Sequence, residues 1–147
     1  MHVPHNAFVV VADGRKMLFL RNEGDAEYPN LQVERVREQD NPSTADQGTD
    51  QPGSAFSSTG AGRSSYEQTD FHQLEEDRFA AETADLLRKR ALSNDFESLI
   101  IIAPPRMLGE LRKHYHKEVS DRLTGELDKD LTGHTVPQIE EALAKAE

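Results

Sequence analysis

The stretch Leu99-Ile100-Ile101-Ile102-Ala103-Pro104-Pro105-Arg106 decides the fold class of this chain. Its first five residues are apolar without interruption, which is typical of a strand that is buried on both faces of a sheet. Two prolines then end the strand, and a helix is expected to begin directly after them. Because a strand covered on both faces needs a layer of helices on each side, the stretch predicts an α/β fold.

Upstream of this strand, shorter segments predict an antiparallel meander. Residues 7–12 and 17–20 are apolar, and Asp13-Gly14-Arg15-Lys16 between them is a turn signal of the kind found in hairpins. A third strand is expected at residues 31–37, where Leu31, Val33 and the aliphatic stem of Arg35 alternate with polar Gln32 and Glu34. Three sequential strands are therefore expected before the first helix.

The first helix is predicted by its caps and by an apolar stripe. Asp70 and Gln73 have the spacing of a capping box, so the helix is expected to begin near Asp70. Acidic residues gather at its start and basic residues at its end, which suits the helix dipole. The polar run that starts at Ser93 is expected to end it.

The remainder of the chain predicts two more helices and a short strand. A second helix follows Pro105, residues 124–131 form a short strand, and the last helix begins at Thr135. The expected order is β-β-β-α-β-α-β-α. This is the ribonuclease-H-like, three-layer α/β arrangement with a mixed five-stranded sheet, and we expect a single domain over residues 1–147.

Residues 38–70 differ from the rest of the chain in composition. The segment is dense in Ser, Thr, Gly, Gln, Asp and Pro, and its only aromatic residues are Phe56 and Tyr66. It therefore lacks the apolar area that would offset the entropy lost on ordering it. We predict a long flexible loop inside the domain at 38–70.

The chain is acidic and contains no cysteine. Its formal net charge is -10 and its pI is near 5.0, so nucleic-acid binding would need a local basic patch. The absence of cysteine excludes disulfides, thiolate catalysis and cysteine-based zinc sites. No apolar run approaches the roughly 20 residues that cross a bilayer, and the early apolar run lacks the features of a signal peptide. We expect no membrane span and a cytoplasmic location.

Three acidic residues are candidates for metal-dependent cleavage of a phosphate ester. Such chemistry needs several carboxylates that converge on ions about 3.5–4 Å apart. Asp13 follows the first strand, where Glu75, Glu76 or Asp77 could reach over from the first helix, and Asp128 and Asp130 lie near the end of the short strand. The central strand would have to supply a further acid at its carboxyl end, but Arg106 stands there instead. We therefore predict no metal site and no catalytic residue, and we keep a phosphoesterase or nuclease as the alternative.

Arg106 is the centre of a candidate anion-binding or partner-binding site. It follows the carboxyl end of the central strand and opens a helix, where open α/β sheets form ligand crevices and helix N-termini attract anions. Arg112 lies about two turns further on, and Lys129 beside Arg106 would complete a small basic notch. Two alternatives stay open: Arg106 pairs with an acid such as Asp130, and Lys129 belongs to a solvated strand edge.

With these residues in view, the chain resembles the bacterial host attachment protein family, which is related to the middle domain of archaeal and eukaryotic peptide-chain release factors. The resemblance covers nearly the whole chain. The motifs that carry it are Val9-Val10-Val11-Ala12-Asp13-Gly14-Arg15, Gly62-Arg63 with Tyr66-Glu67 and Phe71-His72, Glu75-Glu76-Asp77-Arg78-Phe79-Ala80, Ala103-Pro104-Pro105-Arg106-Met107-Leu108-Gly109, and Glu126-Leu127-Asp128-Lys129-Asp130-Leu131-Thr132.

In the release-factor middle domain, the loop between the third strand and the first helix carries a Gly-Gly-Gln motif that promotes peptidyl-tRNA hydrolysis. The corresponding segment here contains Gly60-Ala61-Gly62-Arg63 but no Gly-Gly-Gln. The resemblance therefore implies a non-catalytic interaction module without a cofactor, whose partner is the ribosome, a tRNA or a ribosome-associated protein. Arg63, Arg106, Arg112 and Lys129 are the expected contact residues, and the sequence indicates no oligomeric state.

Overall fold

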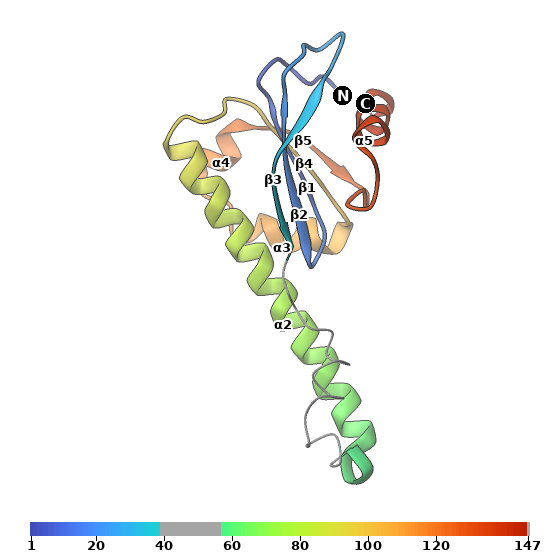
Figure 1. Cartoon of the computed structure of the whole chain (residues 1–147). Helices are drawn as coiled ribbons and strands as arrows, with labels where there is room; N and C mark the ends of the chain where they lie inside the picture. Colours follow the sequence, from blue (N-terminus) through green and yellow to red (C-terminus); the bar gives the residue numbers. More distant parts are fainter. Residues whose placement is uncertain (39–56, 147) are drawn as a thin grey trace.

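The computed structural model describes residues 1–38 and 57–146, with side chains for residues 1–38 and 73–146. In these residues one mixed sheet has five strands in the order β3-β2-β1-β4-β5. The strands are β1 (Phe8–Ala12), β2 (Lys16–Asn22), β3 (Leu31–Glu38), β4 (Leu99–Ala103) and β5 (Leu123–Asp128). The helices are α2 (Ser57–Leu92), α3 (Pro105–Arg112), α4 (Lys117–Arg122) and α5 (Val136–Lys145), and Figure 1 shows how they surround the sheet.

The pairing of the strands confirms the predicted α/β class and the mixed five-stranded sheet. β1 and β2 form an antiparallel hairpin, and β3 adds to β2 in the antiparallel sense. β4 lies parallel to β1, and β5 lies parallel to β4. The predicted meander and the predicted central strand at 99–103 are both present.

The two faces of the sheet carry separate apolar cores because successive side chains along a strand point to opposite sides. On one face, Phe8 and Val10 of β1 and Ile101 of β4 pack against α2, α3 and α4. On the other face, Val9 of β1 and Ile100 of β4 pack against α5. Every residue of β1 and β4 is buried, as the unbroken apolar runs predicted.

The first helix is longer than its sequence signals indicated. α2 begins at Ser57 and not near Asp70. Residues 57–70, which were expected to form part of a loop, are therefore helical, whereas residues 39–56 of that expected loop lie outside the described residues. Figure 1 shows the N-terminal part of α2 extending well beyond the sheet. We call residues 57–72 of α2 the stalk.

The capping-box signal near the predicted start was misleading. The side chain of Gln73 does not turn back to a cap; its Nε2 atom donates to Asp77 Oδ1 at 2.8 Å, one turn further along α2. No proline lies between Pro52 and Pro104, so no proline ring interrupts α2 between Ser57 and Leu92. Once one end of a helix is held by packing, each added residue gains a hydrogen bond.

The predicted second helix is divided into two. α3 ends at Arg112, and α4 begins after His116, whose extended backbone and Nδ1 atom cap the N–H of Glu118. Leu111 of α3 and Val119 of α4 are buried in the same core. Their shared burial explains why the apolar residues of the two helices resembled the stripe of one helix in the sequence. The observed order of elements is therefore β-β-β-α-β-α-α-β-α.

The C-terminal elements agree more closely with expectation. β5 ends at Asp128 and not at 131. Thr135 caps α5 and forms the predicted capping box with Gln138, and Pro137 lies in the first turn. None of the helices in the described part of the chain has the length and apolar composition of a membrane span.

Candidate functional site

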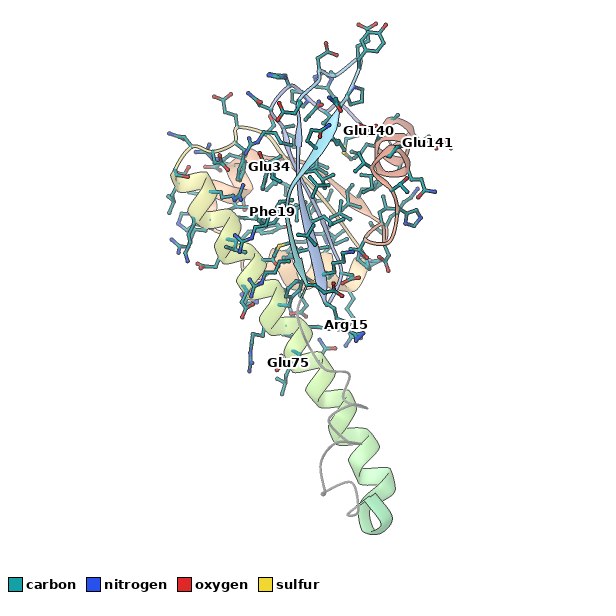
Figure 2. The ribbon with its side chains drawn as sticks, viewed as in Figure 1. Arg15, Phe19, Glu34, Glu75, Glu140 and Glu141 are labelled. Atoms are coloured by element: carbon teal, nitrogen blue, oxygen red, sulfur yellow. The ribbon has the colours of Figure 1, made fainter. Side chains whose placement is uncertain are left out.

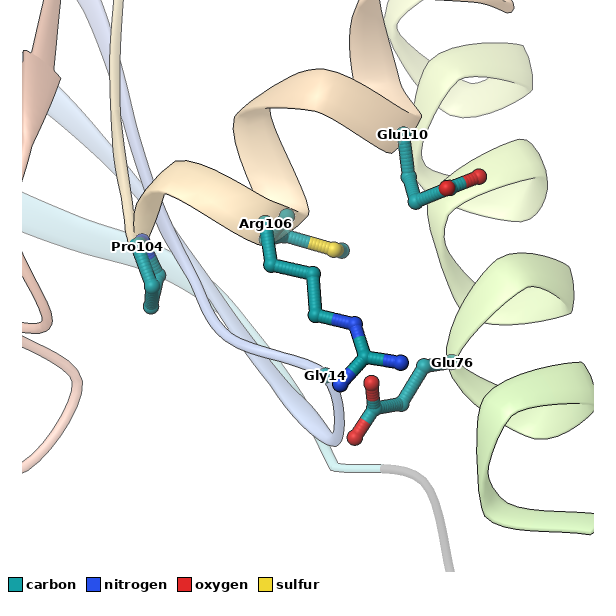
Figure 3. A pocket seen from close by; sticks show the side chains of 6 residues that line it. Gly14, Glu76, Pro104, Arg106 and Glu110 are labelled. Carbon is teal, nitrogen blue, oxygen red and sulfur yellow. The ribbon is translucent and has the colours of Figure 1, made fainter. Parts of the chain in front are cut away.

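A small cleft lies at the edge of the sheet where β1 and β4 end. The two strands are neighbours, but the chain leaves β1 toward β2 and leaves β4 toward β5, so this is the point where open α/β sheets form ligand crevices. The volume of the cleft is about 180 Å³. Its lining, shown in Figure 3, consists of Gly14, Glu76, Pro104, Arg106, Met107 and Glu110.

Arg106 is exposed at this cleft, in the first turn of α3. Pro105 lacks an N–H and Pro104 provides no side-chain cap, so the start of α3 is open to the cleft. Figure 3 shows the guanidinium of Arg106 pointing toward the carboxylate of Glu76 on α2. Arg106 forms no hydrogen bond or ion pair with the residues that the structure describes, and the alternative pairing with Asp130 is not seen among them.

Gly14 brings the hairpin turn close to α2. A Cβ atom at Gly14 would lie 2.7 Å from Cγ and 2.8 Å from Cδ of Glu76. The absence of a side chain at Gly14 therefore lets Glu76 lie over the turn, with its carboxylate at the mouth of the cleft. Glu76 and Arg106 give the cleft both signs of charge.

Asp13 holds the hairpin turn to the segment that follows β5. Its Oδ1 atom accepts the backbone N–H groups of Arg15 and Lys16, both at 2.7 Å. Its Oδ2 atom accepts the hydroxyl of Thr132 at 2.8 Å, and the same hydroxyl lies 3.0 Å from Asp130 Oδ1. Asp13 and Asp130 therefore come together on Thr132, but both oxygens of Asp13 are engaged in holding the turn.

The third acidic candidate lies apart from this contact. Asp128 is exposed at the end of β5, opposite Ala103 in the register of β4 and β5. Within the described residues, no three His, Cys, Asp or Glu side chains converge in a way that could hold a metal ion. Lys129 is also exposed, and its side chain forms no ion pair in that part of the chain.

Arg112 makes a bidentate contact with β5. Its Nη2 and Nε atoms donate to Glu126 Oε1 at 2.8 and 3.1 Å, and this hydrogen bonding raises the pKa of the Arg112 guanidinium. The hydroxyl of Tyr115 donates to the other oxygen of Glu126 at 3.3 Å. Arg112 thus fastens the end of α3 to β5. Arg63 lies in the stalk, where the structure describes only the backbone.

The contact between Tyr115 and Glu126 predicts how stability changes at alkaline pH. Burial, followed by the negative charge of Glu126, raises the pKa of Tyr115 above its ordinary value of 10.0. Because the pKa of Tyr115 is higher in the folded than in the unfolded protein, the protonated Tyr115 hydroxyl contributes fully to stability below pH 10. This contribution is lost as the pH rises through the folded-state pKa. We expect the melting temperature of the wild type to fall more steeply above pH 10 than the melting temperature of Tyr115→Phe. Tyr28→Phe is the control because Tyr28 is 73% exposed. Parallel alkaline curves for wild type and Tyr115→Phe would contradict the expectation.

A family model for bacterial archaeo-eukaryotic release factor family 12 matches residues 6–143. The chain belongs to this family. The match confirms the relation to release factors that the sequence motifs indicated. None of the curated proteins matches the chain at a significant level. Among solved structures, a chain described only as an archaeal protein matches with a TM-score of 0.48 and 10% sequence identity. The match covers 95% of this chain and 33% of the archaeal one, so this chain spans about a third of that protein's length.

In this member of release factor family 12, most basic side chains are neutralised by acids. Among residues 1–38 and 73–146, six Lys and Arg residues form no ion pair: Arg15, Lys16, Arg35, Arg106, Lys117 and Lys129. Four of these six lie after β1, β4 or β5, at the carboxyl end of the parallel strands. We call Arg15, Lys16, Arg106 and Lys129 the cationic edge.

The cationic edge lies beside the place where the stalk leaves the sheet. Figure 2 shows Arg15 at the same level as Glu75 of α2, where the helix begins to extend beyond the sheet. Sequence reasoning placed Arg106 and Lys129 here but missed Arg15 and Lys16, for which the pattern indicated only a turn. A signal for them exists, because the carboxyl ends of the first and central strands meet at one edge once those strands are paired in parallel.

Proposed function

We propose that this chain is a single-domain, non-catalytic binding module in the cytoplasm that associates with the ribosome through RNA. The observation that carries the proposal is the gathering of unpaired basic side chains where the stalk leaves the sheet. Phosphate contacts by Lys and Arg supply most sequence-independent affinity for nucleic acid. A chain with a net charge of -10 can bind RNA only through such a local surface.

The position of the stalk supports the proposed association with the ribosome. α2 follows the segment after β3, where the resembling release-factor domain carries its Gly-Gly-Gln motif. The sequence of this chain contains no Gly-Gly pair, so the glycine-dependent presentation of a glutamine has no counterpart here. Hydrolysis of peptidyl-tRNA is therefore not part of the proposed function. The strand order β3-β2-β1-β4-β5 supports a ribonuclease-H-like fold as part of the same proposal.

No observation on the described residues favours the phosphoesterase alternative. Asp13 and Asp130 meet on one hydroxyl, but Asp13 accepts three hydrogen bonds from within the chain. Arg106, and no acid, follows the central strand at the cleft. The geometry therefore supports binding by charge in preference to phosphate-ester cleavage.

Co-sedimentation with bacterial ribosomes tests the proposal. We expect the wild-type protein to appear in the ribosomal pellet at low salt and to leave it as the salt concentration rises, because ion-pair contacts with phosphate release counterions. A peptidyl-tRNA hydrolysis assay on the same complexes is expected to give no release above background. Absence of the protein from every ribosomal fraction at low salt would overturn the association, and release of the peptide would overturn the non-catalytic assignment.

A further inference from the structure

A second recess lies at the end of the molecule opposite the stalk. It is formed by the N-terminal segment, the loop between β2 and β3, and α5, and its volume is about 90 Å³. Val3, Leu31 and Leu143, all buried, provide an apolar floor. Glu27 and Glu140 lie on its rim. We call this recess the acidic groove.

The walls of the acidic groove are held in place before any partner arrives. Asn22 is fully buried, and its side chain contacts the β2–β3 loop through three hydrogen bonds and the carbonyl oxygens of Val3 and Pro4 in the N-terminal segment through two more. Asp25 Oδ1 accepts the backbone N–H groups of Glu27 and Tyr28, at 3.0 and 2.7 Å. Glu140 Oε2 accepts the N–H of Leu31 at 2.8 Å. A recess with fixed walls loses little entropy when a ligand binds.

The two rim carboxylates are not neutralised within the described residues. Neither Glu27 nor Glu140 forms an ion pair there. Lys145, on the same helix as Glu140, is engaged by Glu141 at 2.9 Å. The amino group of Met1 donates to the carbonyl oxygens of Leu143 and Ala146 at the end of α5. Figure 2 shows Glu140 and Glu141 at the opposite end of the sheet from Arg15.

We propose that the acidic groove binds a Lys- or Arg-rich segment of a partner protein. A recess with apolar lining and two carboxylates fits one basic side chain, because its aliphatic stem can cover Pro29 and Ala144 while its charged end reaches Glu27 and Glu140. Tyr28 does not line the groove, but it lies between Glu27 and Pro29 in the sequence and is 73% exposed, so its ring is available to a second cation of the same segment. The same carboxylates repel RNA, so this surface and the cationic edge select partners of opposite charge. This proposal does not depend on ribosome association.

Titration of residues 1–147 with a labelled oligoarginine peptide, followed by fluorescence anisotropy, tests the proposal. The variant Glu27→Gln with Glu140→Gln keeps the size of both side chains, and the carbonyl oxygen of the amide introduced by Glu140→Gln can still accept the N–H of Leu31. We expect the double variant to bind the peptide at least about tenfold more weakly, since two charge-assisted contacts are lost. The matched control is Glu97→Gln with Asp121→Asn, which removes the same charge from two exposed acids that do not line the groove.

Three outcomes would overturn the assignment. The first is equal weakening by both double variants, which would mean general attraction between an acidic protein and a cationic peptide. The second is failure of the folded wild type to bind oligoarginine at low salt. The third is self-association of the wild type in sedimentation velocity that the Glu27→Gln, Glu140→Gln variant abolishes, because the groove would then belong to a second copy of the chain. Weakening by Tyr28→Ala together with the groove variant would support the proposal.

Discussion

Replacing Asn22 with leucine is expected to lower the free energy of unfolding by about 4 kcal/mol. The side chain of Asn22 is completely buried and every polar atom in it is used. Its Nδ2 atom donates to the carbonyl oxygens of Val3, Pro4 and Asp25, at 2.9, 3.2 and 3.2 Å. Its Oδ1 atom accepts two further N–H groups from the β2–β3 loop. Leucine of similar size removes all five contacts, and although Pro4 O keeps the N–H of Ala7 at 3.0 Å, the other four backbone groups lose Asn22 as their partner, which explains the size of the loss.

Thermal unfolding followed by circular dichroism measures this effect, with an expected fall in Tm of roughly 15 °C. Asn22→Asp provides a second test, because it keeps an acceptor but places a carboxylate oxygen against three carbonyl oxygens, so it should be at least as destabilising at neutral pH. Gln32→Leu on the neighbouring strand β3 is the control, since Gln32 is exposed and its loss should change stability by less than about 0.5 kcal/mol. Similar melting of Asn22→Leu and Gln32→Leu would show that Asn22 does not hold the loop.

The strands of the sheet could be predicted because burial determines which positions along a strand are apolar, and this pattern is visible in the sequence. The residues of β1 and β4 are apolar at every position, since both faces of these strands are covered by helices. β3 lies at an edge of the sheet and is mostly exposed beyond Leu31, and a register shift opposite Phe19 and Leu20 interrupts its expected alternation. The pairing order then follows from the turn after Asp13 and from the helices between the parallel strands.

The helices were less predictable because the decisive contacts are distant in sequence. Capping-box spacing occurs at both Asp70–Gln73 and Thr135–Gln138, yet only the second is used, through hydrogen bonds in both directions. Gln73 bonds to Asp77 within a helix that already began at Ser57. Spacing alone does not distinguish a cap from an ordinary contact between neighbouring turns.

Contacts between residues that are distant in sequence also limited the prediction of the candidate site. The approach of Arg106 to the hairpin turn could be inferred, because both follow strands that end at one edge of the sheet. The ion pair of Arg112 could not be inferred, because its partner Glu126 lies on a different element. The sequence suggested Asp13 as a metal ligand, but its Oδ2 atom accepts a hydrogen bond from Thr132, which is distant in sequence. Charge counts in a sequence therefore overestimate how many cations and carboxylates are free to act.

Reversing two charges on the cationic edge is expected to weaken ribosome association by about a hundredfold at low salt. The variant is Arg15→Glu with Arg106→Glu, two exposed residues that follow β1 and β4. Each lost phosphate contact should also reduce the slope of log affinity against log salt by about one unit. Arg15→Gln with Arg106→Gln removes the charges without adding repulsion, so it should give a smaller loss in the same direction.

The matched control for this experiment exists within the same chain. Arg35 and Lys117 are the other two basic residues that form no ion pair in the described residues, and they lie on β3 and α4, away from the cationic edge. Arg35→Glu with Lys117→Glu changes the net charge by the same amount, so it corrects for the general repulsion of an acidic protein by RNA. If both double variants lose affinity equally, the location of the charges is irrelevant and the cationic edge is not the contact surface. If only the Arg15 and Arg106 variant loses affinity while its melting temperature is unchanged, the RNA must approach the sheet from the side of the stalk.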